Sequence, residues 1–231
     1  MPMNQAELDR LMKRIESGRE YRDIRVPFEI RSAEDGSDTM IVEGYATTYS
    51  DEYLLYDWGD YRVMEQVDPA AFNNCDMSDV IMQYDHAGRV FAAIRNNTLT
   101  LSSDQHGLHV RADLGGTELG RQLYYEIKGG YTTQMSMAFR VGKDVRTVEE
   151  DHEHNIMTVH RTITSISKLY DVSAVSRPAN PATEISARSF CEGVIAELEA
   201  ERLKADESEK RKKMESDERE RKLALLEFEL N

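Results

Sequence analysis

The chain contains little cysteine, proline or tryptophan and no long apolar stretch. Of its 231 residues, two are cysteine, five are proline and one is tryptophan. Cys75 and Cys191 lie far apart among polar neighbours, so we expect reduced thiols rather than a disulfide-stabilised secreted domain. No apolar run is long enough to cross a bilayer and no signal peptide is recognisable, so the sequence predicts a protein that is neither exported nor embedded in a membrane.

An excess of basic residues is also lacking. Lys and Arg number 29 against 43 Asp and Glu, which gives a net charge of −14. A surface of this sign repels nucleic-acid phosphates, and neither a basic patch nor a nucleic-acid-binding motif stands out. The length allows one domain with a sizeable core and an appendage. The composition therefore favours an acidic globular protein that does not bind nucleic acid.

Hydropathy patterning divides the chain into three segments: a helix at 1–20, a β-rich domain at 21–188 and a tail at 189–231. In the first segment, Leu8, Leu11, Met12 and Ile15 have helical spacing and predict a short amphipathic helix.

In the second segment apolar residues alternate with polar ones, and clusters of Gly, Asn, Asp and Ser separate the alternating runs. Two short helices are expected, at 69–73 after Asp68 and at 117–128 before Gly129. This pattern predicts a mainly β (α+β) fold: an antiparallel β-barrel or strongly curved sheet with a few surrounding helices. The expected strands cover residues 27–31, 39–49, 98–102, 108–113, 135–141, 157–166 and 168–175.

The third segment begins with a helical apolar stripe and becomes almost wholly charged from Lys204 to Lys222. It ends in the apolar stretch Leu223–Leu230. Mixed-sign charge without Gly or Pro in the middle part favours a long solvated helix or a partial coiled coil over a random linker. We therefore expect a charged helical tail.

Three short segments contain the groups of serine-nucleophile chemistry. His86 follows an apolar run, Ser136 lies in the alternating stretch Met135–Phe139, and Asp171 lies in the alternating stretch Leu169–Val175. An imidazole, a hydroxyl and a carboxylate are the groups that this chemistry requires. Their order, His then Ser then Asp, differs from that of chymotrypsin, subtilisin and the α/β-hydrolases, and no Gly-x-Ser-x-Gly elbow is present.

The residues by themselves leave structural roles open. A strand serine is nearly always only structural, His86 could be a hydrogen-bonded core histidine, and Asp171 could be an exposed carboxylate at a strand edge. Asp85 is a weaker candidate for the orienting carboxylate. The other histidines lie at a hairpin turn or around an acidic loop, where a zinc site without cysteines would be poor, so we do not expect metal catalysis. The acidic neighbour of Cys75 disfavours a catalytic thiolate.

The order and spacing of several motifs resemble those of the prohead (capsid maturation) proteases of tailed bacteriophages, from about Tyr45 to about Thr183. Members of that family resemble the herpesvirus assembly proteases, which have a β-barrel rather than a chymotrypsin fold. No single motif is decisive, but their order along the chain is specific. The matching stretches read EGYATTY, EQVDPAAF, DHAGRV, NNTLTLSSDQHGLHVRADL, MSMAFRV and LYDVSAVSRPANPAT.

The resemblance implies a serine endopeptidase in which Ser136 is the nucleophile, His86 the general base and then acid, and Asp171 the orienting carboxylate. It also implies a backbone amide near Arg177 as an oxyanion donor. The implied substrates and partners are capsid and scaffold proteins, the protease's own termini and further copies of the chain. The implied location is the assembling procapsid in the bacterial cytoplasm, with no cofactor, metal, nucleic acid or membrane.

Two other hypotheses remain. The chain could be a non-enzymatic capsid assembly or scaffold protein that has the same fold and a scaffold-type helical tail. A weaker hypothesis is a β-rich esterase or peptidase unrelated to viruses.

Overall fold

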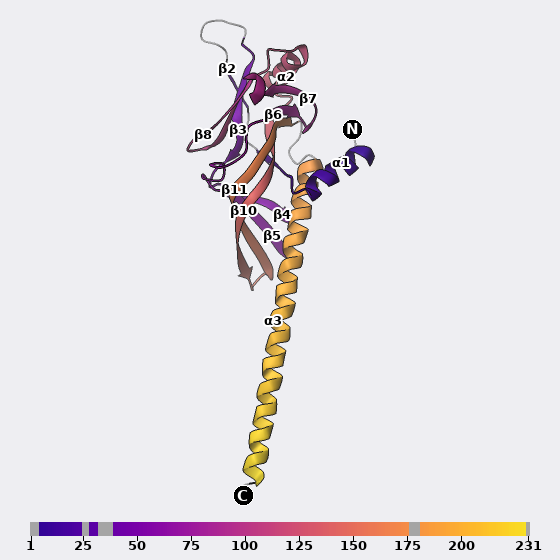
Figure 1. Ribbon diagram of the computed structural model, residues 1–231, viewed down its shortest axis with the longest axis vertical. Helices are drawn as coiled ribbons and strands as arrows, with labels where there is room; N and C mark the ends of the chain where they lie inside the picture. The colour runs from indigo at the N-terminus through magenta and orange to yellow at the C-terminus, as the bar shows by residue number, and fades with distance from the viewer. Residues whose placement is uncertain (1–4, 25–27, 32–38, 176–180, 230–231) are drawn as a thin grey trace. The chain divides into compact units, whose positions relative to one another are not determined.

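The computed structural model describes residues 5–24, 28–31, 39–175 and 181–229 and is mainly β with a few helices (Figure 1). Contacts divide the chain into two units, Met1–Arg188 and Ser189–Asn231. The strands given below all belong to the first unit.

A long antiparallel hairpin organises the larger sheet of the first unit (Figure 1). Its arms are β10 (Gln134–Asp151) and β11 (Ile156–Val175). Strand β1 (Glu20–Ile24) pairs antiparallel with β10. On the other side of the hairpin, β5 (Tyr61–Val67) runs parallel to the first half of β11, and β6 (Ile81–Tyr84) runs parallel to its last residues.

Two antiparallel strands complete the larger sheet. β4 (Tyr53–Asp57) pairs with β5, and β7 (Ala87–Ala93) pairs with β6. A 3-10 turn, η1 (Ile94–Asn96), follows β7 and leads towards the second sheet.

Among the described residues, the smaller sheet has four antiparallel strands in the order β2, β3, β9, β8. They are β2 (Glu29–Arg31), β3 (Ile41–Thr48), β9 (Gly107–Asp113) and β8 (Leu99–Ser103).

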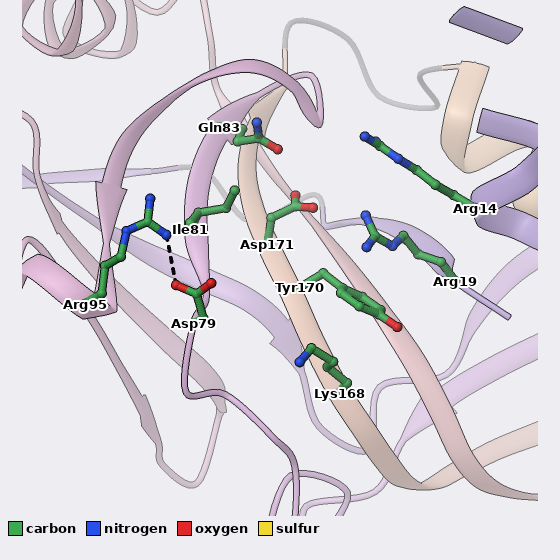
Figure 2. Close-up of a pocket in the computed structure, with 9 residues that line it drawn as sticks. All are labelled: Arg14, Arg19, Asp79, Ile81, Gln83, Arg95, Lys168, Tyr170 and Asp171. Atoms are coloured by element: carbon green, nitrogen blue, oxygen red, sulfur yellow. Dashed lines mark hydrogen bonds and ion pairs between the residues drawn. The ribbon is translucent and has the colours of Figure 1, made fainter. Parts of the chain in front are cut away.

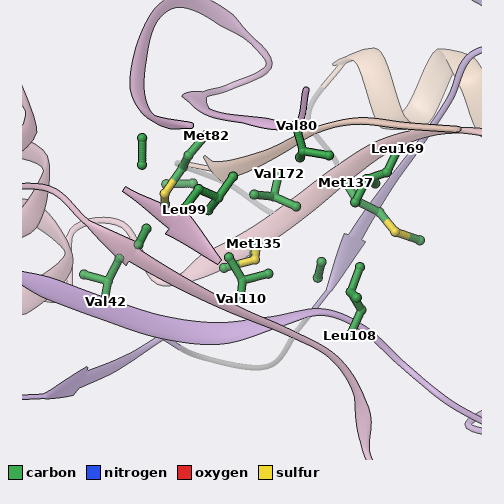
Figure 3. Close-up of a cluster of buried hydrophobic side chains, with 14 of the residues drawn as sticks. Val42, Val80, Met82, Leu99, Leu108, Val110, Met135, Met137, Leu169 and Val172 are labelled. Carbon is green, nitrogen blue, oxygen red and sulfur yellow. The ribbon is translucent and has the colours of Figure 1, made fainter. Parts of the chain in front are cut away.

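The main hydrophobic core lies between inward-facing side chains of both sheets (Figure 3). Met135, Met137 and Val172 contribute from the β10–β11 hairpin, and Val42 and Val110 contribute from the smaller sheet; all are at most 1% exposed. Because side chains alternate along a strand, the residues between them on β10 and β11 face away from this core. The opposite face of the hairpin is therefore available for polar groups.

The predicted antiparallel barrel is not confirmed. Within the described residues neither sheet closes on itself: the larger one ends at β1, β4 and β7, and the smaller one at β2 and β8. The larger sheet is also mixed, because β5 and β6 run parallel to β11. Alternation in the sequence indicates strands and their buried faces, but pairs such as Tyr61 with Met157 join strands far apart in the chain. A local pattern does not determine such partners.

Several elements differ from the predicted ones. Residues 69–73 form successive turns instead of a helix, although Asp68 accepts the backbone N–H of Ala70 on its side chain and that of Ala71 on its carbonyl. The strands expected at 157–166 and 168–175 form the single strand β11. Five of the observed strands were not predicted from the sequence, namely β1, β4, β5, β6 and β7.

The described residues also form three helices. α2 (Glu118–Lys128) confirms the helix expected at 117–128, and Thr117 caps it by accepting the Gly120 N–H. α1 (Gln5–Glu16) precedes β1. α3 (Pro181–Glu229) begins in the first unit and forms the helix of the second. None of the helices in the described residues is long and apolar enough to span a membrane.

Candidate active site

A tight hairpin turn positions His86. Tyr84 and Ala87 pair at the ends of β6 and β7, and the two residues between them, Asp85 and His86, have φ values of 48° and 56°. Two consecutive positive φ values define the type I′ turn, which matches the twist of a hairpin but costs on the order of 1–3 kcal/mol per residue other than glycine. The Asp85 N–H donates to the Ala174 carbonyl at 3.0 Å. The turn is thereby held beside the end of β11.

The hairpin of β10 and β11 positions the other two candidates. Ser136 on β10 pairs with Ser173 on β11, and Ala138 pairs with Asp171. The side chains of these residues share the face that points away from the main core. The alternating stretches that contain Ser136 and Asp171 in the sequence therefore place both side chains on this face.

The structure brings His86, Ser136 and Asp171 together in one hydrogen-bonded chain. His86 Nδ1 lies 2.5 Å from Asp171 Oδ1, and His86 Nε2 lies 2.6 Å from Ser136 Oγ. An ionised carboxylate can only accept, so this arrangement puts the ring proton on Nδ1 and leaves the Nε2 lone pair facing the hydroxyl. Ser173 Oγ also donates to Asp171 Oδ1 at 2.9 Å, which fixes the carboxylate. Such a chain can activate a hydroxyl as a nucleophile.

A second acceptor lies next to the Ser136 hydroxyl. Ser136 Oγ is 3.0 Å from the carbonyl oxygen of Arg22 on β1. The ring of Tyr21, the neighbouring β1 residue, meets the His86 ring edge-on with 4.9 Å between centroids. No motif or pattern in the sequence indicated that residues of the first 25 would reach this site.

A largely buried charge cluster joins β1 to β5 and β11 and is made of Glu20, Arg22, Glu65 and Arg161. Arg22 donates to Glu65 at 2.5 and 2.9 Å, and Arg161 donates to Glu65 at 2.7 Å and to Glu20 at 2.8 Å. Burial alone would raise the pKa of the Glu65 carboxyl, but the charges and hydrogen bonds of Arg22 and Arg161 outweigh it and lower that pKa to about 2. Sequence reasoning missed this cluster, because four charged strand residues far apart in the chain look like solvated positions.

A pocket of about 310 Å³ opens beside Asp171 (Figure 2). Arg14 and Arg19 of the N-terminal segment lie along one side of it, and the Arg19 guanidinium stacks 3.7 Å from the centroid of the Tyr170 ring. On the opposite side Arg95 pairs with Asp79 at 2.9 Å. The pocket is therefore rich in positive charge, and part of its wall comes from residues that precede β1.

The other sequence candidates fall elsewhere. Arg177 lies outside the described residues. Burial raises the pKa of the Cys75 thiol to about 11, so this cysteine is poorly suited to act as a thiolate nucleophile. His160 pairs with Glu52 and His154 with Asp151, both at the exposed surface. In the described part of the chain, no three or more His, Cys, Asp or Glu side chains gather in a way that could hold a metal ion.

Comparisons with known proteins agree with the sequence motifs. A family model described as Caudovirus prohead serine protease matches residues 26–194, a range that begins after β1 and includes His86, Ser136 and Asp171. No curated protein matches the chain. Among solved structures, the bacteriophage T4 capsid assembly protease, gp21, is similar at 11% identity and a TM-score of 0.33, over 68% of this chain and 98% of that one. This structural likeness is too distant to support a functional argument, whereas the family match covers most of the chain.

Proposed function

The chain belongs to the caudovirus prohead serine protease family, and we propose that it is a serine endopeptidase that cleaves segments of scaffold and capsid proteins as the procapsid matures. It acts within the procapsid and also cleaves its own termini. The observation that most supports this proposal is the pair of hydrogen bonds at His86, from Nδ1 to Asp171 and from Nε2 to Ser136.

The first step is attack by Ser136 on the scissile carbonyl carbon. As the Oγ–C bond forms, His86 Nε2 takes the hydroxyl proton and the carbonyl π electrons move onto oxygen. The resulting imidazolium keeps its Nδ1–H bond to Asp171, whose negative charge stabilises it. We assign stabilisation of the oxyanion to backbone N–H groups near Arg177.

The second step releases the two halves of the substrate. His86 returns the proton from Nε2 to the leaving amine nitrogen, and the C–N bond breaks to leave an acyl group on Ser136. A water molecule then attacks the acyl carbon while His86 again acts as base. The new carboxyl terminus leaves, Ser136 regains its proton, and no cofactor takes part.

The second candidate function is that of a non-enzymatic capsid assembly protein with this fold. The burial of Ser136, which is 0% exposed, favours it, because a substrate cannot reach this side chain as it stands. The two functions differ in one property: only the enzyme has a Ser136 that reacts as a nucleophile.

A serine-reactive fluorophosphonate tests that property. The full-length protein is incubated with the probe, and the modified residue is identified by peptide mass. The proposal predicts modification of Ser136 in the wild type and none in His86→Ala, since the hydroxyl then loses its base. A Ser78→Ala variant controls for a surface serine outside the site. Equal modification of His86→Ala, or no modification of Ser136 in any form of the protein, contradicts the proposal and supports the assembly protein.

A further inference from the structure

Ser136 and His86 are closed off from solvent in this structure. Ser136 is 0% exposed and His86 is 4% exposed. For attack, however, a substrate carbonyl has to come within about 3–3.5 Å of the nucleophile. Whatever covers these side chains must therefore move before a peptide can bind.

Strand β1 covers them. In the antiparallel register of β1 and β10, Asp23 lies opposite Ser136, and the side chains of Tyr21 and Asp23 share the face of Ser136. The Tyr21 ring lies against His86, and the carbonyl oxygen of Arg22 accepts a hydrogen bond from Ser136 Oγ. Both reactive groups are thus in contact with the same short strand.

β1 occupies the edge of β10 in the way that a bound peptide would. An extended peptide that adds to a sheet edge gains main-chain hydrogen bonds and directs alternate side chains into the site. β1 does so along Met135–Phe139, the stretch that contains Ser136. At Arg22, however, the carbonyl oxygen and not the carbon faces the hydroxyl. This peptide is held beside the nucleophile in an unreactive orientation.

The N-terminal segment also lines the neighbouring pocket. Arg14 and Arg19 lie along the side of the pocket beside Asp171 (Figure 2). The family match begins at residue 26, so these two arginines and β1 all precede the part of the chain that the family model describes. This is the relation expected between a regulatory segment and a shared catalytic domain.

One face of β1 has a charged anchor on β5. There Arg22 donates to Glu65 at 2.5 and 2.9 Å, and both side chains are buried. On the other face the Tyr21 hydroxyl is buried and finds no hydrogen-bond partner among the described residues, which opposes the attachment. The anchor can thus be weakened at the Arg22 side chain without altering His86, Ser136 or Asp171.

We propose that β1 is a built-in competitor of the substrate: it fills the β10 edge on which an extended peptide substrate pairs, and the enzyme is active only in molecules where β1 has left that edge. This inference rests on the proposed function. The partner that fits the vacated edge is a peptide in extended conformation that pairs antiparallel with β10. Observed activity is then proportional to the fraction of molecules with a free edge.

A reversible cross-link tests whether β1 has to move. Tyr21 on β1 and Ala138 on β10 lie opposite each other. The Tyr21 N–H donates to Ser186 and not to β10, so the two residues form a non-hydrogen-bonded pair. The side chains of such a pair are close enough for a disulfide. In Tyr21→Cys/Ala138→Cys, oxidation should slow fluorophosphonate labelling of Ser136 by about tenfold or more, and reduction should restore it. Tyr21→Cys alone is the control and should not respond to oxidation. Failure of the two cysteines to join would contradict the pairing itself.

A second variant loosens the strand instead of fixing it. Arg22→Met removes the anchor but keeps the backbone carbonyl, and Glu65 retains Arg161 at 2.7 Å and Tyr53 at 2.6 Å. Labelling of Ser136 should become about tenfold faster than in the wild type. The matched control is Arg62→Met, which removes an arginine from an exposed pair with Asp57 and should label at the wild-type rate.

The outcomes separate this inference from the proposed function. If Ser136 is labelled equally fast in the oxidised, reduced, loosened and wild-type proteins, β1 does not compete with the substrate, while the serine protease stands. If Ser136 is labelled in none of them, the proposed function fails and the inference fails with it.

Discussion

The Ser136 hydroxyl has one proton and two acceptors within reach. Donation to His86 Nε2, at 2.6 Å, is the arrangement that activates the oxygen, whereas donation to the Arg22 carbonyl, at 3.0 Å, leaves it inert. Departure of β1 removes the second acceptor. The same movement would therefore admit a substrate and leave the hydroxyl with a single, productive partner.

His86→Ala should lower peptide hydrolysis by about 10⁴–10⁶-fold, because it removes the group that takes the Ser136 proton in the proposed mechanism. Since the two residues act as a unit, His86→Ala/Ser136→Ala should be hardly slower than either single variant. The measurement is kcat/KM on a peptide from a cleaved capsid-protein segment. His160→Ala is the control and should remain near the wild type. If the effects of the two single variants multiply in the double variant, His86 and Ser136 do not act together.

Asp171→Asn should lower kcat by about 10⁴-fold while changing KM little, because it disturbs the tautomer and charge at His86 but not the shape of the site. Asp85→Asn, in the turn next to His86, is the matched control and should keep most of the activity. If Asp85→Asn is the slower variant, Asp85 and not Asp171 orients the histidine.

At the scale of single residues, the sequence identified the candidate site residues that lie in short motifs. His86, Ser136 and Asp171 could each be proposed from local pattern and family resemblance, and the structure places them within hydrogen-bond distance of one another. Arg22 could not be proposed, because its role depends on a hydrogen bond from Ser136, 114 residues further along the chain. The part proposed for Arg177 stays a prediction, since that residue lies outside the described chain.

At the scale of elements, the buried charge cluster should be a principal support of β1 and β5. Glu65→Gln leaves Arg22 and Arg161 with less compensation for their buried charges, so we expect a loss of about 3–5 kcal/mol in the free energy of unfolding. Asp57→Asn, which affects an exposed pair with Arg62, should cost much less stability. Urea denaturation of both variants gives the comparison. A Glu65→Gln variant that is as stable as the wild type would show that the cluster contributes little to the free energy of unfolding.

The same carboxylate predicts a pH dependence of stability. Its pKa is lowered from 4.5 to about 2 in the folded protein, because the two arginines outweigh the effect of burial. A lowered pKa means that the contribution of Glu65 is complete above pH 4.5 and is lost as the pH falls towards 2. The stability difference between the wild type and Glu65→Gln should therefore narrow across this window. A difference that stays constant down to pH 2 would contradict the assigned pKa.

The elements that could be predicted from the sequence are those whose determinants are local. Helix α2 has its cap, its apolar stripe and its terminating glycine between Thr117 and Gly129, and it was predicted. Strand β1 was missed because its charged residues Glu20 and Arg22 are buried only through partners on β5 and β11. The open, mixed sheet was missed for the same reason: strand partners and directions depend on long-range contacts.

At the scale of the whole molecule, we propose that the tail is needed for incorporation into the procapsid and not for catalysis. Its middle part is nearly all charged and cannot form a core. The tail also exposes Leu203 and Met214, at 64% and 73%. Truncation after Arg188 should keep peptide hydrolysis within about twofold but reduce the copies packaged per procapsid. Normal packaging would refute the targeting role, and loss of hydrolysis would assign the tail to the catalytic fold.

The most direct test of the central claim is processing in the assembling particle. The protein, or its Ser136→Ala variant, is produced together with the capsid and scaffold proteins, and new peptide termini are mapped by mass spectrometry. Losing one buried hydroxyl changes the packing little, so the variant should fold and assemble like the wild type, yet its cleavage should fall by about 10⁴–10⁶-fold, below detection. We predict new termini in the scaffold and capsid proteins with the wild type and none with Ser136→Ala. The same termini appearing at the same rate with a folded Ser136→Ala protein would contradict the assignment of this chain as the serine protease.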